Sequence, residues 1–161
     1  MREFFQTETS ASRHCRREAA RLGEAQPAHV LRAVADHADQ VLATLPALAK
    51  QHDLPISATG AALGALFSEA RDKFADLLID RERSFRGTLL GVRHGLDLAR
   101  LIHFAITETC DLGLEEFIEN WIATRVVLVQ NLEDELLWFA RHPVEARRSA
   151  RAPSLRLRRA T

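Results

Sequence analysis

Five polar residues in the second half of the chain have the types and spacing to bind an anion. Arg86, Arg93 and Arg100 recur every seven residues, so a helix would place them on one face. Asp97 lies four residues after Arg93, and His94 is its neighbour. Guanidinium groups present paired donors that match a carboxylate or a phosphate. The pattern predicts either an anion site or a solvated face of ordinary ion pairs, and the solvated face is its commoner meaning.

The histidines lack the spacing of a metal site on one helix. A helical site places ligands three or four residues apart, but no two histidines have that spacing and no histidine lies three residues after a glutamate. His103 has Ile102 and Ile106 near it, which favours a hydrogen-bonded core histidine. We therefore expect no metal and no cofactor, although ligands gathered from several helices remain an open alternative.

Nucleophilic catalysis finds little support. Cys15 and Cys110 are isolated, which suggests a reducing, cytoplasmic setting rather than a disulfide framework. Cationic neighbours of Cys15 would lower its thiol pKa on an exposed arm, but such an arm excludes water poorly. No phosphate-binding glycine loop or G-x-S-x-G sequence occurs. The sequence predicts a protein that is not an enzyme.

Five of the seven glycines recur four residues apart inside predicted helices. Each costs about 1 kcal/mol of helix propensity relative to alanine, so a compensating role is expected. A spacing of four places them on one face, where a second backbone can approach closely. The pattern predicts a helix-packing face within the chain, a homodimer face, or a groove for an apolar ligand. The glycines are Gly60, Gly64, Gly87, Gly91 and Gly95.

The elements that position these residues are expected to be helices in one domain. Of the 161 residues, 47% are hydrophobic and 27% charged, and tyrosine is absent. Ala, Leu, Arg and Glu dominate, and all four favour helices. Twenty arginines against two lysines suggest a GC-rich bacterial genome. The composition is that of a globular all-α protein.

Apolar periodicity predicts an antiparallel up-down four-helix bundle. The expected helices cover about 27–51, 57–80, 85–110 and 114–142. Apolar positions shift by one residue near Asp80 to Ser84, which predicts a turn there. The alternative fuses the two middle helices into one rod that a second chain must complete. The run Val126 to Val129 is apolar on all sides, which predicts deep burial.

The two termini are expected to lie outside this bundle, which occupies 25–142. Residues 1–24 are polar and are interpreted as an arm containing at most a short helix. Residues 143–161 carry six arginines and one glutamate, so this tail has charge +5 and the rest of the neutral chain −5. The acidic body argues against a nucleic-acid-binding domain. The arginine-rich tail has no aromatic residue to stack on bases, and we interpret it as a solvated, disordered tail. No apolar stretch is long enough to predict a membrane span.

The sequence does not identify a family or a specific role. We expect a non-enzymatic interaction or scaffold protein that self-associates, because helical seams and glycine faces are its clearest features. A protein partner is possible. The alternative is a small-molecule or metal carrier with a pocket in the bundle core.

Overall fold

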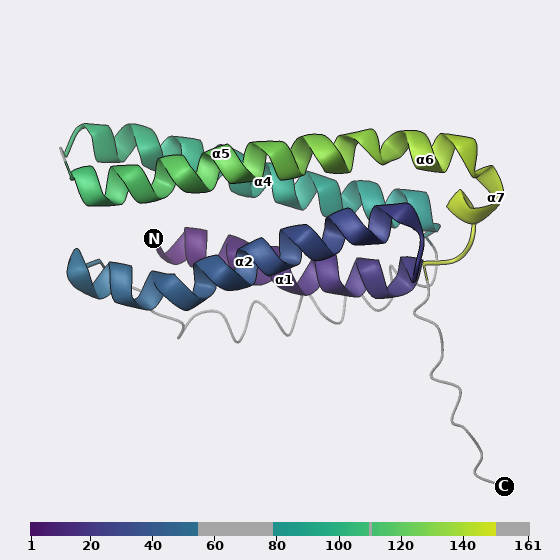
Figure 1. Cartoon of the computed structure of the whole chain (residues 1–161), viewed down its shortest axis with the longest axis horizontal. Coiled ribbons are helices and arrows are strands. Elements are labelled where there is room, and N and C mark those ends of the chain that lie inside the picture. The colour runs from purple at the N-terminus through teal and green to yellow at the C-terminus, as the bar shows by residue number, and fades with distance from the viewer. Residues whose placement is uncertain (55–78, 110, 151–161) are drawn as a thin grey trace, which may run out of the picture.

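The computed structural model describes residues 1–54, 79–109 and 111–150. Figure 1 shows two helical hairpins that lie side by side, with their helices running along the long axis of the molecule. The prediction of an all-α bundle is confirmed: four long helices pack together. In the described ranges the helices are α1 (Arg2–Leu22), α2 (Gln26–Gln51), α4 (Arg81–Thr107), α5 (Leu112–Asp134), α6 (Leu136–Arg141) and α7 (Pro143–Ala146).

The long helices run antiparallel to their main neighbours. α1 packs on α2 and α4, and α5 packs on α4 and α2. The end of α2 meets the start of α5, where His52 Nδ1 lies 2.6 Å from Asp111 Oδ2. α4 begins at the opposite end, where Asp80 pairs with Ser149. α2 and α4 therefore run in the same direction (Figure 1). The helix expected over 57–80 falls almost wholly outside the described residues.

α1 is a full member of the bundle, whereas the sequence suggested an arm with at most a short helix. It has 21 residues and contacts both α2 and α4. Its apolar stripe looked thin because Glu8, Glu18 and Arg21 also point inward and are buried. Apolar periodicity does not register such positions. The buried apolar residues of α1 are Phe4, Cys15, Ala19 and Leu22.

The helix ends follow local chemistry. Gly23 closes α1 with φ 66°, a left-handed conformation that glycine adopts without strain, and its N–H donates to Ala19 O. Pro27 stands in the first turn of α2, as predicted. Asp80 is extended, with φ −81° and ψ 169°, and its carboxylate accepts from Arg83 N at 2.8 Å. The predicted break near Asp80 is therefore confirmed, and the single fused rod is excluded.

The core of α4 matches the predicted stripe, but that of α5 differs. The α4 stripe is buried at Phe85, Leu89, Val92, Leu96, Ala99 and Ile106. In α5, Val129 is buried, whereas Val126 and Val127 are 40% and 58% exposed. The prediction of deep burial there is wrong, because four consecutive residues point around the whole helix and the described neighbours of α5 do not surround it.

Residues 143–150 make defined contacts, although the sequence predicted a disordered tail from residue 143. After α7, Arg81 N–H donates to Arg148 O at 2.9 Å, and Ala150 N–H donates to Ile79 O at 3.1 Å. These bonds hold the chain against the start of α4. Residues 151–161 lie outside the described part. No helix among the described residues is long and apolar enough to cross a membrane.

Candidate functional sites

A buried ion pair joins α1 to α5 in the bundle core. Arg125 Nη2 donates to Glu8 Oε2 at 2.5 Å, and both side chains are 1% exposed. Trp121 Nε1 donates to the same oxygen at 3.2 Å. The Arg125 guanidinium also lies 4.8 Å from the centre of the Trp121 ring, which is cation–π geometry. Both charges therefore have specific partners away from water.

Burial dominates the electrostatics of this cluster. It raises the pKa of Glu8, although the charge of Arg125 and two hydrogen bonds oppose the shift. Burial also raises the pKa of the Cys15 thiol to about 12. The expectation of an exposed thiol with a lowered pKa is thus wrong, because α1 turns Cys15 into the core. Burial and Arg125 lower the pKa of His37 to about 4, so this imidazole is neutral at pH 7.

A second buried polar cluster joins α1 to α4. Ser84 Oγ donates to Glu18 Oε2 at 2.6 Å, and Arg21 Nη1 lies 3.0 Å from both of these oxygen atoms. The cluster borders a cleft of about 640 Å³ between the two helices, which Gly87 and Gly91 also line. The lining is mixed polar and apolar, unlike a closed apolar ligand cavity.

The glycines predicted as a packing face divide into two groups. Gly60 and Gly64 lie outside the described residues. A Cβ built on Gly87 or Gly91 meets nothing within 4 Å, whereas one on Gly95 would touch Thr7 Cβ at 3.8 Å. Among the described residues, α1 therefore packs closely at only one end of the predicted face.

The residues of the predicted anion cluster do not form one site, because they do not all line the same cleft and each of the three arginines has an acidic partner. Arg86 lies 2.6 Å from Glu82, and Arg93 Nε donates to Glu133 Oε1 at 2.9 Å. Arg93, Asp97 and Arg100 share a small cleft between α4 and α5, where Arg100 pairs with Asp97 at 3.3 Å. His94 instead lines the cleft between α1 and α4.

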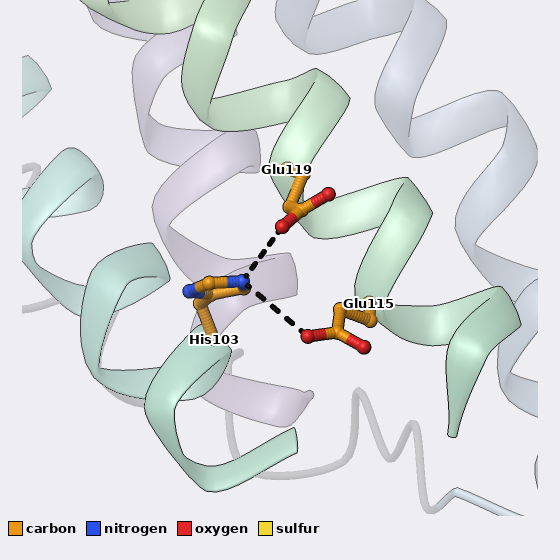
Figure 2. A group of neighbouring side chains, drawn as sticks. All are labelled: His103, Glu115 and Glu119. Carbon is orange, nitrogen blue, oxygen red and sulfur yellow. Dashed lines mark hydrogen bonds and ion pairs between the residues drawn. The ribbon is translucent and has the colours of Figure 1, made fainter. Parts of the chain in front are cut away.

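A third cluster brings one histidine to two glutamates across the α4–α5 hairpin. His103 Nε2 lies 3.3 Å from Glu119 Oε1 and 3.9 Å from Glu115 Oε1. Figure 2 shows the imidazole on α4 facing both carboxylates on α5. His103 and Glu115 are about one quarter exposed, whereas Glu119 is 60% exposed. The sequence predicted a core position for His103, but this side chain lies partly exposed between α4 and α5.

Sequence reasoning missed these clusters for different reasons. Glu8 and Arg125 stand on the apolar faces of their helices, at seven-residue spacing from Cys15 and Ile118, so their place in the pattern was a usable signal. Only part of the cluster at His103 could be predicted from the sequence. The i, i+4 pair Glu115 and Glu119 is visible in the sequence, but the register of α4 on α5 is not.

Comparison with known proteins adds no family to this picture: no family model, curated protein or solved structure matches the chain.

Proposed function

We propose that this protein is a non-enzymatic interaction or scaffold protein that works as a homodimer through an exposed seam on α4. The observation that carries the proposal is an uninterrupted 3-4 spacing of six exposed positions. Three are large apolar side chains: Leu90, Leu101 and Phe104 are 67%, 66% and 70% exposed. We call these positions the α4 seam: Gly87, Leu90, His94, Asp97, Leu101 and Phe104.

The α4 seam is complementary to itself when two copies pair antiparallel. A two-fold axis near residues 95 and 96 would set Phe104 against Gly87, and Leu90 against Leu101. It would also set His94 against Asp97. Apolar side chains would then meet apolar or empty positions, and an acid would meet an imidazole. Symmetric dimers use the same patch on both subunits, so self-complementarity favours a second copy as the occupant.

The glycine in this seam supports the same arrangement. The space beside Gly87 is open among the described residues, as it is beside Gly91. In a coiled-coil seam each knob enters a hole formed by the facing helix, and glycine makes the deepest hole. A Cβ built on Gly87 would meet nothing within 4 Å among the described residues, so a partner side chain has room to approach this position.

A second candidate function is a carrier of a small polar molecule. It is favoured by the cleft of about 640 Å³ between α1 and α4, which is within the usual size of ligand pockets. The buried Glu18 and Ser84 would supply its orienting groups. Native mass spectrometry of protein purified from its own host tests this function, because a retained ligand would appear as an added mass. We also propose a cytoplasmic location, and the free thiol of the buried Cys15 supports it.

Sedimentation velocity over a wide concentration range tests the dimer. We expect wild type to pass from one-chain to two-chain mass as concentration rises. Leu101→Gln should shift this midpoint at least about tenfold, because burying an unpaired amide costs about 1–3 kcal/mol. Leu137→Gln is the matched control: Leu137 is 59% exposed, lies on α6 and is not one of the α4 seam positions.

Two outcomes would contradict the dimer. Wild type could remain at one-chain mass at every concentration. Alternatively, Leu101→Gln could lower the melting temperature equally at all concentrations without changing the mass. The second result would mean that Leu101 is covered within its own chain rather than by a second copy.

A further inference from the structure

The cluster at the α4–α5 hairpin has the donor set and spacing of a metal site. Metal–ligand bonds of about 2.0–2.2 Å place tetrahedral ligand atoms roughly 3.4 Å apart. His103 Nε2 already lies 3.3 Å and 3.9 Å from the two carboxylate oxygens. Ligand atoms of all three residues lie within 4.8 Å of one another. Only small side-chain adjustments would bring them onto one ion.

The helices fix this arrangement through ordinary periodicity. Glu115 and Glu119 are four residues apart on α5, so they lie one turn apart on the same face. α4 returns antiparallel beside that face and presents His103 to both carboxylates (Figure 2). Because the ligands come from two helices, a bound ion would also clamp the hairpin.

The charge of the hairpin independently favours a cation. Residues 101–124 contain five carboxylates and neither lysine nor arginine. Among the described residues, Glu115 and Glu119 form ion pairs with His103 alone. Elsewhere in the described part, acidic side chains commonly face arginines, such as Glu133 with Arg93. Among the described residues, the α4–α5 hairpin between residues 101 and 124 therefore carries more negative than positive charge.

We propose that His103, Glu115 and Glu119 bind one Zn²⁺ ion. One imidazole nitrogen and two carboxylate oxygens are ligands that zinc accepts, and three protein ligands leave a fourth position for water. The site is partly exposed, so the ion can enter from solvent. This inference is independent of the dimer, because none of the three ligands belongs to the α4 seam.

Isothermal titration of metal-free full-length protein with Zn²⁺ tests the proposal. We expect one saturable site per chain. His103→Gln and Glu119→Gln should each weaken this site by at least about tenfold, since each removes a ligand and second-shell losses alone cost that much. Bound Zn²⁺ should also raise the melting temperature of wild type, because the ion binds only the folded hairpin.

Matched controls separate the site from general charge and from adventitious histidine binding. Glu116→Gln removes the same charge from an exposed neighbour on α5, and His29→Gln removes an exposed histidine on α2. Both should bind Zn²⁺ as wild type does. Circular dichroism should show the same helix content in all variants. The proposal is overturned if wild type has no saturable site, or if His103→Gln binds as tightly as wild type.

Discussion

Glu8 and Arg125 are opposite charges in the centre of the bundle, each 1% exposed. Removing one partner of such a pair leaves an uncompensated buried charge. We expect Glu8→Gln to lower the free energy of unfolding by about 3–5 kcal/mol. Glu8→Leu combined with Arg125→Met should restore stability to that of wild type or higher, because neither charge of this pair is then buried without its partner. Urea unfolding of wild type, Glu8→Leu, Arg125→Met and the double variant measures the cycle. Additive losses would contradict the pairing.

His37 makes stability depend on pH in mildly acidic solution. Its pKa is about 4 in the folded protein and 6.5 in ordinary surroundings, so the unfolded chain binds the proton first as the pH falls. Stability is therefore lost as the pH drops from about 6.5 to about 4, and the loss is complete below that window. Urea unfolding at several pH values should show a smaller loss for His37→Gln than for wild type. Parallel curves for the two proteins would contradict the lowered pKa.

Single residues also show where sequence reasoning stops. The neutral state of His37 and the protonated thiol of Cys15 follow from burial, which depends on how four helices meet. The sequence placed Cys15 among arginines on an exposed arm, and only the packing of α1 reverses that environment. The charges of sequence neighbours predict a pKa shift poorly, because burial and contacts with other helices determine the surroundings of the side chain.

At the scale of elements, periodicity and breakers predicted more. The start of α2 at Pro27, the break at Asp80 and the buried stripe of α4 agree with the sequence, because caps and 3.6-residue spacing are local properties. The role of α1 did not emerge, since polar residues occupy part of its buried face. The position of His103 relative to Glu115 also could not be predicted, because it depends on the register between α4 and α5.

The glycine face of α4 gives a test at this scale. Among the described residues nothing approaches a Cβ on Gly91, so Gly91→Ala should raise the free energy of unfolding by up to about 1 kcal/mol through helix propensity. Gly95→Ala is the matched comparison, with only an ordinary contact to Thr7 at 3.8 Å. Thermal melts at low protein concentration measure both. A destabilised Gly91→Ala would mean that another segment packs tightly on this face.

At the scale of the whole molecule, the α4 seam and the hairpin cluster lie on neighbouring surfaces with different chemistry. The α4 seam is apolar with a central acid and imidazole, whereas the hairpin is rich in carboxylates. One surface favours a second copy of the chain, and the other favours a cation. The buried pair of Glu8 and Arg125 is part of neither surface. We interpret it as an interaction that fixes the position of α1 relative to α5.

Disulfide trapping tests the central claim, antiparallel pairing through the α4 seam, most directly. In a Cys110→Ser background, the chain would carry Leu90→Cys and Leu101→Cys together, with each single variant as a control. Antiparallel pairing places position 90 of one chain beside position 101 of the other. Like positions are then about 16 Å apart along the helix, as are the two positions within one chain, which is too far for a disulfide. After mild oxidation, the account predicts a reducible two-chain species for the double variant and one-chain species for both single variants. A double variant that stays at one-chain mass, or single variants that cross-link equally well, would contradict it.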